Sequence, residues 1–513
     1  MQDWKQYLPE FRDKTAAFYA GEMTKGDYKK FSGFYGSYAQ RSGEVSMLRL
    51  RLTAGCVRKD KLAAIAGIIR KYGIKKVHFT TCQTIQLHDL KPEIVADVIE
   101  SAIDAGFVTI GGGGDYPRNV MCSPLSGVEK GEYFDVSPWA QAAGNYMISL
   151  ITAEKMPRKL KVGFSNSPAN TSHVTYRDLG FAANEDGTFD VYSAGGLGNN
   201  ARLGVKVAEG IEPGMILYYI KAMWLTFRAY GNYENRGRAR TRYMQDTLGG
   251  PEKYAEAFRG KLKEVMDSGE ELWVQAESKP IEKSGDGGTI TDHRVTEQKQ
   301  EGLYTVSWHP IGGQPPVDEL LALADALAGM EDAELRLSPD ETAYIVNLTS
   351  KEAKKVLSIT KSSAVTRFET TVSCIGAGIC QIGLRDSQKL LRSCVEAARE
   401  AGLPDGVLPQ MHISGCPSSC GTHQTGEIGF RGAVKKVDGK PQSAFMLFVN
   451  GSEYQGKERM GEELGAILEA DIPKFIVKLG KHVAAQGISY AEWKEKNPDG
   501  VRELAAEYLD ENL

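Results

Sequence analysis

Two pairs of cysteines stand close together in the second half of the sequence. Cys374 and Cys380 are separated by five residues in "CIGAGIC", and Cys416 and Cys420 by three in "GCPSSCG". Zinc sites usually space both pairs by two to four residues, so the first pair fits zinc poorly. Iron-sulfur clusters take four thiolates with looser spacing, and small neighbouring residues let backbone N-H groups approach their sulfides. The pattern therefore favours an iron-sulfur cluster over zinc.

The other four of the eight cysteines are isolated among apolar or threonine neighbours: Cys56, Cys82, Cys122 and Cys394. Burial as a small hydrophobic side chain is expected for each of them. A cytosolic chain is not expected to use its cysteines in a disulfide framework. Metal ligation therefore concerns only the two close pairs.

Three stretches carry cations that would suit an oxyanion. "MLRLRL" places Arg49 and Arg51 on one face of a strand, "DYPRNV" holds Arg118 after a glycine-rich turn, and "MPRKLK" places Lys159 and Lys161 on one face if extended. A solvated strand edge and a lone surface arginine are the plain alternatives for the first two. Reduction of an oxyanion needs fixed cations that hold its oxygens and supply protons.

A run of arginines lies in "NRGRARTRY", at Arg236, Arg238, Arg240 and Arg242. Such a run could bind RNA, but it lacks interleaved aromatic residues. The whole chain has 62 Lys and Arg against 66 Asp and Glu, a formal charge of -4. Neither nucleic acid nor an anionic membrane is therefore expected as a partner.

The glycine-rich stretch "SAGGLGNNARLG" has the spacing of a weak dinucleotide motif at Gly196, Gly198 and Ala201. No clear helix follows it, and no acidic residue stands in a matching strand. No NAD(P)H or flavin site is predicted in this chain. Electrons must then come from a separate donor.

The two cysteine motifs closely resemble the C-x5-C and G-C-P-x-x-C-G signature of sulfite and nitrite reductases that carry siroheme and a [4Fe-4S] cluster. The resemblance implies that Cys374, Cys380, Cys416 and Cys420 bind the cluster. It also implies that Cys420 bridges the cluster to the siroheme iron.

The cation stretches resemble the R-x-R, R-N-V and P-R-K-x-K or P-R-K-x-N segments of this family. The resemblance implies that Arg49, Arg118, Lys159 and Lys161 bind the substrate. Lysine at the position of Lys161 is typical of the sulfite branch and asparagine of the nitrite branch. A second ammonium also suits sulfite, which is partly a dianion at neutral pH. Six-electron reduction of sulfite to sulfide is predicted, with reduction of nitrite to ammonium, alone or beside sulfite, as the alternative.

Siroheme carries eight carboxylates, so its pocket needs cations and N-H donors. "TTCQTIQLH" is similar to the family pattern T-x-R-Q-x-x-Q-x-H, but Cys82 stands where an arginine usually contacts siroheme. The cofactor-binding residues implied by the resemblance are Arg51, Thr80, Gln86, His88, Arg158, Gly196, Gly198, Arg236, Arg238 and Arg240.

The elements around these residues predict an internal repeat. A strand, a helix and further strands are predicted in turn from "MLRLRLTAG", "DKLAAIAGIIRKYG" and "KVHFTTCQTIQLHDL". The same order returns after a polar linker, in "LYTVSWHPIGG", "VDELLALADALAGM" and "AELRLSPDETAYIVNLTS". Strand-helix-strand units are common, so chance similarity is the alternative. The fold class expected is α/β (α+β), with a pseudo-two-fold repeat of ferredoxin-like half-domains and two α/β domains that bind siroheme and the cluster.

A chain of 513 residues is expected to form two or three domains. The boundaries predicted are an N-terminal arm at 1-45, a first half-domain at 46-118, a siroheme-binding middle domain at 119-276, a linker at 277-302, a second half-domain at 303-360, a cluster and siroheme domain at 361-475, and a C-terminal helical segment at 476-513.

The N-terminal stretch "MQDWKQYLPEFRDK" mixes charges and does not read as a signal peptide. The longest apolar runs fall short of the roughly 20 residues that span a bilayer. A cytoplasmic enzyme is expected, with ferredoxin or a small flavoprotein as electron donor. A non-catalytic iron-sulfur or zinc protein is the remote alternative.

Overall fold

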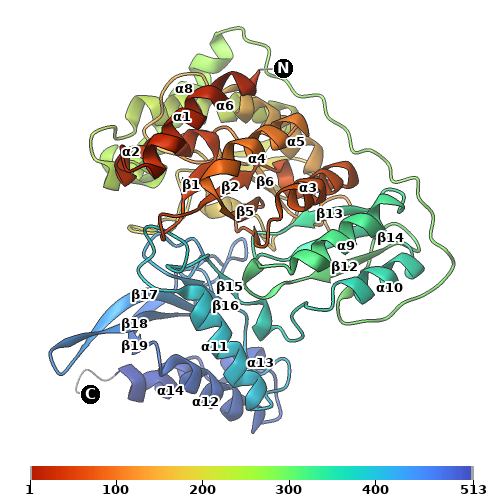
Figure 1. Cartoon of the computed structure of the whole chain (residues 1–513), viewed down its shortest axis with the longest axis vertical. Helices are drawn as coiled ribbons and strands as arrows, with labels where there is room; N and C mark the ends of the chain where they lie inside the picture. The colour runs from red at the N-terminus through yellow and green to blue at the C-terminus, as the bar shows by residue number, and fades with distance from the viewer. Residues whose placement is uncertain (1–2, 510–513) are drawn as a thin grey trace. The chain divides into compact units, whose positions relative to one another are not determined.

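The protein is described here by a computed structural model that covers residues 3-509. The chain divides into two compact units (Figure 1). The first comprises Met1–Gly196, Asn200–Trp308 and Pro315–Lys361, and the second comprises Leu197–Asn199, His309–Gln314 and Ser362–Leu513. No helix of the described residues is long and apolar enough to cross a membrane.

The first unit contains a pair of similar substructures. In one, an antiparallel sheet has the order β1-β2-β5-β4, with strands β1 (Ser37–Ala39), β2 (Ser46–Leu50), β4 (Val77–Phe79) and β5 (Ile85–Leu90) and helices α3 (Lys59–Tyr72) and α4 (Pro92–Asp104). The other has the order β11-β12-β14-β13-β3, with β11 (Val295–Glu297), β12 (Tyr304–Trp308), β13 (Glu334–Leu337), β14 (Ala343–Leu348), α9 (Val317–Ala328) and α10 (Ser350–Ile359).

Apolar spacing explains why these elements form and pack. In β2, Leu48 and Leu50 are fully buried while Arg49, between them, points to the other face. In α3, Leu62, Ile65 and Ile69 recur at helical spacing on the buried side. Side chains of both substructures belong to one hydrophobic core. The predicted strand-helix-strand repeat is thus present, and the predicted mixed α/β fold class is confirmed.

One short strand joins the two substructures. β3 (Cys56–Arg58) follows β2 in the chain but pairs with β13, Val57 lying opposite Leu335. Three residues are too few to show an alternating pattern, so the sequence did not indicate that β3 pairs with a strand of the other substructure. Residues 3-45, within the predicted N-terminal arm, contain α1 (Leu8–Tyr19), α2 (Lys25–Ser32) and the strand β1 of the first sheet, and Phe11 of α1 is fully buried in the shared core.

A further sheet in the first unit has the order β10-β9-β8-β7-β6. Its strands are β6 (Met121–Cys122), β7 (Val162–Ser165), β8 (Leu179–Ala183), β9 (Phe189–Ser193) and β10 (Val205–Ile211), and its helices are α5 (Ser137–Ser149), α6 (Ile216–Tyr230), α7 (Met244–Thr247) and α8 (Pro251–Asp267). β6, β7 and β8 are parallel, and β8, β9 and β10 are antiparallel. After α8 a long segment without helix or strand leads to β11 (Figure 1).

The second unit is built on a sheet of order β15-β16-β17-β18-β19. Its strands are β15 (Val372–Ser373), β16 (Met411–Ser414), β17 (Ile428–Val437), β18 (Lys440–Val449) and β19 (Glu462–Leu468), and its helices are α11 (Ser387–Glu400), α12 (Ile472–Ala484), α13 (Tyr490–Lys496) and α14 (Gly500–Leu509). Here too the first three strands are parallel and the rest antiparallel.

The sheet β10-β9-β8-β7-β6 and the sheet β15-β16-β17-β18-β19 therefore share one arrangement of strands. β7 and β16 start at Val162 and Met411, and β8 and β17 start at Leu179 and Ile428, about 250 residues apart in each case. The turns that follow β7 and β16 share a left-handed residue, Asn170 with φ 52° in the first and Ser419 with φ 53° in the second. The internal repeat extends beyond the half-domains to these sheets.

Candidate anion and cofactor site

Two of the predicted substrate-binding arginines meet at one backbone atom of the first unit. Arg49 Nη1 donates to the carbonyl oxygen of Gly112 at 2.6 Å, and Arg118 Nη1 donates to the same oxygen at 2.7 Å. Arg118 Nη2 also donates to Gly114 O at 2.9 Å. Burial and the charge of Arg49 lower the pKa of Arg118 to about 10, so the Arg118 guanidinium stays charged at neutral pH.

The loop that receives these arginines is glycine-rich because its neighbours leave no room. A Cβ atom on Gly113 would lie 2.4 Å from the Tyr38 hydroxyl and 2.5 Å from the Gly33 carbonyl oxygen. Such distances are far inside van der Waals contact, so only glycine fits there. The "IGGGG" turn therefore brings its carbonyl groups close to the strand that carries Arg49.

Arg51 lies two residues further along and has another role in the structure. Its side chain is buried, and its Nη atoms donate to the carbonyl oxygens of Pro117 at 2.7 Å and Arg118 at 3.0 Å. These bonds fix the backbone that carries Arg118. Contact of Arg51 with a cofactor stays a prediction.

Lys159 and Lys161 flank Leu160, which is fully buried. The segment is extended: Arg118 N donates to Leu160 O at 2.9 Å, and Leu160 pairs with Pro117 as a parallel bridge. This pairing places the two lysines on the side opposite the Leu160 side chain, as the sequence predicted for an extended segment. It also links them through the backbone to Arg118.

Cys82 contacts one of these lysines. Lys161 Nζ donates to Cys82 Sγ at 3.1 Å. Burial alone would raise the pKa of the Cys82 thiol, but the charges of Lys161, Arg177 and Lys159 lower it to about 6. A pKa of about 6 favours the thiolate form of Cys82 at neutral pH. From its neighbours in the sequence, Cys82 was predicted to be only a small buried side chain. The one sign of a special role was that a cysteine stands where the family motif has an arginine.

The predicted carboxylate-binding arginines already hold carboxylates of the chain. Arg158 Nη1 and Arg236 Nη2 donate to Asp115 Oδ1 at 2.8 and 3.1 Å, and Arg240 Nη2 bonds both oxygens of Asp178 at 3.0 and 3.1 Å. Arg238 is exposed on the same segment. Among residues 3-509, the buried Nε atoms of Arg118 and Arg240 have no hydrogen-bond partner. Spare buried donors and arginines placed for carboxylates fit a polycarboxylate such as siroheme.

Gln86 and His88 lie on β5, and Gln86 pairs across the sheet with Arg49. Both are buried, and Gln86 Oε1 is 3.2 Å from His88 Nε2. Burial and the neighbouring His78 lower the pKa of His88 well below its usual value, so its ring is neutral. Thr80 has its hydroxyl 2.7 Å from that of Thr84, within the turn before β5.

The two predicted glycines of the "GGLG" turn fall in different units. Gly196, in the first unit, exchanges two backbone hydrogen bonds with Arg202, each of 2.9 Å. Gly198, in the second, donates to Gln424 Oε1 at 2.7 Å and accepts from Gln424 Nε2 at 3.1 Å. Gln424 follows the second cysteine pair by four residues. Gly198 therefore lies against the segment that carries Cys420.

The structure brings the segments of both cysteine pairs together in the second unit. Gly415 N donates to Cys374 Sγ at 3.2 Å, and Cys374 N donates to Ile413 O at 3.1 Å. Burial and the nearby Cys420 raise the pKa of the Cys374 thiol to about 12. A bound iron cluster must therefore displace that proton. Among residues 3-509, no group of three or more His, Cys, Asp or Glu side chains is arranged to hold a metal ion.

Close backbone approach surrounds the cysteines, as a cluster requires. A Cβ atom on Gly421 would lie 2.1 Å from Ile413 O and 3.2 Å from Cys374 N. Cys374 Sγ also lies 3.2 Å from the hydroxyl of Ser387, at the start of α11. N-H and O-H donors to a sulfur are the contacts that a thiolate ligand of an iron-sulfur cluster receives. The donors around Cys374 Sγ fit one thiolate ligand of such a cluster.

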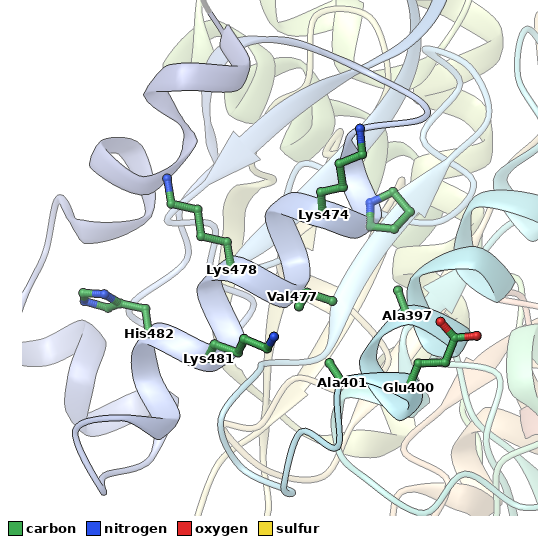
Figure 2. Close-up of a pocket in the computed structure, with 9 residues that line it drawn as sticks. Ala397, Glu400, Ala401, Lys474, Val477, Lys478, Lys481 and His482 are labelled. Atoms are coloured by element: carbon green, nitrogen blue, oxygen red, sulfur yellow. The ribbon is translucent and has the colours of Figure 1, made fainter.

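A surface groove of about 880 Å³ lies elsewhere in the second unit, between α11 and α12. Figure 2 shows Lys474, Lys478 and Lys481 extending from α12 beside Ala397 and Ala401 of α11. Lys474 donates to Asp471 at 2.7 Å and Lys478 to Glu507 at 2.9 Å, so two of the three ammonium groups have acidic partners. None of the predicted site residues lines this groove.

Two protein-family models match the chain. Residues 38-104 match the nitrite/sulfite reductase ferredoxin-like half domain, and residues 113-266 match the nitrite and sulphite reductase 4Fe-4S domain. The first match contains Arg49 and Cys82, and the second contains Arg118 and both lysines. The four paired cysteines lie outside both matched ranges.

Curated relatives of similar length carry related names. The ferredoxin-nitrite reductase of Synechococcus elongatus is 27% identical, over 79% of this chain and 80% of its own. The assimilatory ferredoxin-dependent nitrite reductase of Haloferax mediterranei is 26% identical, over 92% and 86%. The sulfite reductase [NADPH] hemoprotein beta-component of Bacillus licheniformis is 26% identical, over 81% and 79%.

A solved structure has the same fold. The NirA protein of Mycobacterium tuberculosis superimposes with a TM-score of 0.77, covering 97% of this chain and 96% of its own. The two sequences are 21% identical, so the likeness concerns the fold alone.

Proposed function

Because this chain belongs to the nitrite and sulfite reductase family, whose cofactors are siroheme and a [4Fe-4S] cluster, we propose that it reduces nitrite to ammonium. The reaction takes up six electrons and eight protons per nitrite and releases two waters. The observation that carries the proposal is the convergence of Arg49 and Arg118 on Gly112 O, beside the segment of Lys159 and Lys161.

The side chains of the first unit bind the anion and supply protons. Arg49 and Arg118 present N-H donors to the oxygens of the substrate, and they keep their charge throughout the reaction. Burial lowers the pKa of Lys161, so its ammonium is a stronger acid than that of a solvated lysine. Lys161 is thus suited to deliver a proton to a departing oxygen, and Lys159 is placed to assist.

Cys374, Cys380, Cys416 and Cys420 would hold the cluster, and the arginines of the first unit would hold the carboxylates of siroheme. When bound, the two groups would supply electrons to the anion one at a time. The donor proposed is ferredoxin, because the relatives from Synechococcus elongatus and Haloferax mediterranei are named for it. A flavoprotein donor and the cytoplasmic location stay predictions from the sequence.

Reduction of sulfite to sulfide is the second candidate, and one observation favours it. Lys159 and Lys161 project from the same extended segment, and two ammonium groups suit a dianion better than a monoanion. The names of the relatives favour nitrite, since most of those compared are nitrite reductases. The preference for sulfite stays a prediction.

The experiment that tests the proposal compares both anions on the purified holoenzyme with reduced ferredoxin as donor. The kcat/KM for nitrite is expected to exceed that for sulfite, with ammonium as the product. A larger kcat/KM for sulfite with sulfide as product would favour the second candidate. Lys161→Asn is expected to weaken sulfite reduction more than nitrite reduction, and Lys75→Asn, an exposed lysine of the same unit, serves as the control.

A further inference from the structure

Cys82 and Lys161 form a contact between two segments that are 79 residues apart in the chain. The Sγ and Nζ atoms are separated by 3.1 Å. The charged groups that act most strongly on the Cys82 thiol are all cations: Lys161, Arg177 and Lys159. Arg118 is in turn stabilised in its charged form by Cys82. The sulfur therefore lies among the cations to which the proposed function assigns the substrate.

The turn that carries Cys82 is held by side chains on several sides. Asn119 Nδ2 donates to the carbonyl oxygens of Leu52 at 2.7 Å, Cys82 at 3.1 Å and Gln83 at 3.2 Å. Cys82 N donates to Thr80 Oγ1 at 3.3 Å. A turn with this many bonds keeps the sulfur in place beside Lys161, unlike a thiol on a mobile surface loop.

Gln83 ties the same turn to β6. Its Nε2 donates to Cys122 O at 2.8 Å, and its Oε1 accepts from Cys122 N at 2.9 Å. Gln83 has a left-handed backbone with φ 52°, which bends the chain so that Cys82 and Gln83 are directed differently. The position of Cys82 is thus built into the fold of the first unit.

We propose that Cys82 is the thiolate counter-ion of Lys161 and a specificity-determining residue of the anion site. This inference rests on the proposed function, because it assumes that Lys161 and its neighbours bind the substrate. One negative charge beside Lys161 removes one unit of net positive charge from the site. The electrostatic energy of a dianion changes twice as much as that of a monoanion when this charge is present. Cys82 therefore favours nitrite over the sulfite dianion, although the second lysine is kept.

The kinetic test replaces the thiolate with neutral and charged side chains. Cys82→Ser keeps the size of the side chain and removes its charge at neutral pH. It is expected to lower the KM for sulfite and to raise the sulfite-to-nitrite ratio of kcat/KM by about tenfold. Cys82→Asp restores a negative charge and is expected to keep the wild-type ratio. Cys56→Ser, at another partly buried cysteine of the first unit, is the matched control and should leave the ratio unchanged.

A spectroscopic test of the charge does not depend on turnover. The infrared difference between wild type and Cys82→Ser holoenzyme should contain no S-H stretching band at neutral pH, and the band should appear as the pH falls below about 6. The corresponding difference for Cys56→Ser should contain the band at neutral pH, because burial and Glu334 raise the pKa of Cys56. The other thiols cancel in each difference.

The outcomes separate the two proposals. An S-H band of Cys82 at neutral pH, or an unchanged ratio in Cys82→Ser, would overturn the role given to Cys82 while leaving the proposed reduction intact. If the wild-type holoenzyme reduced neither anion, the proposed function would fail, and the inference about specificity would fail with it. Equal changes of the ratio in Cys82→Ser and Cys82→Asp would mean that the shape of the turn, and not its charge, sets the preference.

Discussion

The guanidinium groups of Arg49 and Arg118 share one acceptor, the carbonyl oxygen of Gly112, at 2.6 and 2.7 Å. Like charges held this close repel each other, and the arrangement is stable only because carbonyl oxygens accept from both. An anion that binds there would relieve the repulsion. This pair of arginines is thus a natural place for a small oxyanion in the first unit.

Removal of either arginine is expected to impair anion reduction. Arg49→Ala and Arg118→Ala should each lower kcat/KM for nitrite by about 100-fold, because each removes a fixed charged donor from the site. Steady-state kinetics of the holoenzyme measure this. Arg58→Ala, which removes an exposed arginine paired with Asp60, is the control and should retain wild-type kinetics. Full activity in Arg118→Ala would exclude it from substrate binding.

Asn119 is expected to be important for stability. Its side chain accepts from Leu52 N at 3.1 Å and donates to the carbonyl oxygens of Leu52, Cys82 and Gln83. Asn119→Ala leaves these buried groups without partners and should lower the free energy of unfolding by about 2-3 kcal/mol. Chemical denaturation measures this loss. Asn145→Ala, at an exposed position of α5, should cost much less, and an equal loss in both variants would contradict the role assigned to Asn119.

The iron content tests the four paired cysteines. Loss of the cluster is expected when serine replaces any one of Cys374, Cys380, Cys416 and Cys420, because each change removes one of four thiolate ligands. Iron and acid-labile sulfide in the purified protein measure the loss. Cys394→Ala, at a fully buried cysteine in α11, is the control and should keep both. A variant of the paired cysteines with full iron and sulfide content would remove that residue from the ligand set.

The stability of the protein should depend on pH through Cys82. The folded thiol has a pKa of about 6, below its ordinary value. Between these two values the unfolded chain binds one more proton at this group than the folded chain does. The contribution of Cys82 to the free energy of unfolding therefore rises with pH in this window, by up to about 1.4 kcal/mol per pH unit, and is lost as the pH falls through about 6.

Melting temperatures of wild type and Cys82→Ser across this window test the dependence. The wild type should gain stability relative to the variant as the pH rises, because serine does not ionise there. The two proteins should differ least in the acidic part of the window. A difference that does not change with pH would mean that the Cys82 thiol titrates at its ordinary value.

Much of the fold could be predicted from the sequence, because its signals are local. The spacing of Leu62, Ile65 and Ile69 predicts α3, and the alternation around Arg49 predicts β2. The strand-helix-strand order of each half can then be read from the order of these local patterns along the sequence. The pairing of β3 with β13 could not be predicted, since it depends on a long-range contact of a three-residue strand.

In the candidate site, too, the residues with a local sequence signal were predicted and the long-range contacts were not. The family motif singled out Arg49, Arg118, Lys159 and Lys161, and the structure adds which atoms Arg49, Arg118 and Lys161 contact. The contact between Lys161 and Cys82 was not predicted, since nothing in the local pattern of "TTCQT" indicates a partner 79 residues away. The assignments of Thr80, Gln86 and His88 to siroheme stay predictions.

The sheet β10-β9-β8-β7-β6 and the sheet β15-β16-β17-β18-β19 carry different side chains on one shape of turn. Both follow parallel strands with antiparallel ones, and the turn after β7 bends at Asn170 as the turn after β16 bends at Ser419. In the first sheet that turn reads "SNSPANT", with Ser167 and Thr171 where the second has Cys416 and Cys420 in "SGCPSSC". The shape of the turn is thus common to both sheets, whereas the pair of thiols belongs to the second. One backbone turn can therefore present hydroxyl groups in one sheet and thiol groups in the other.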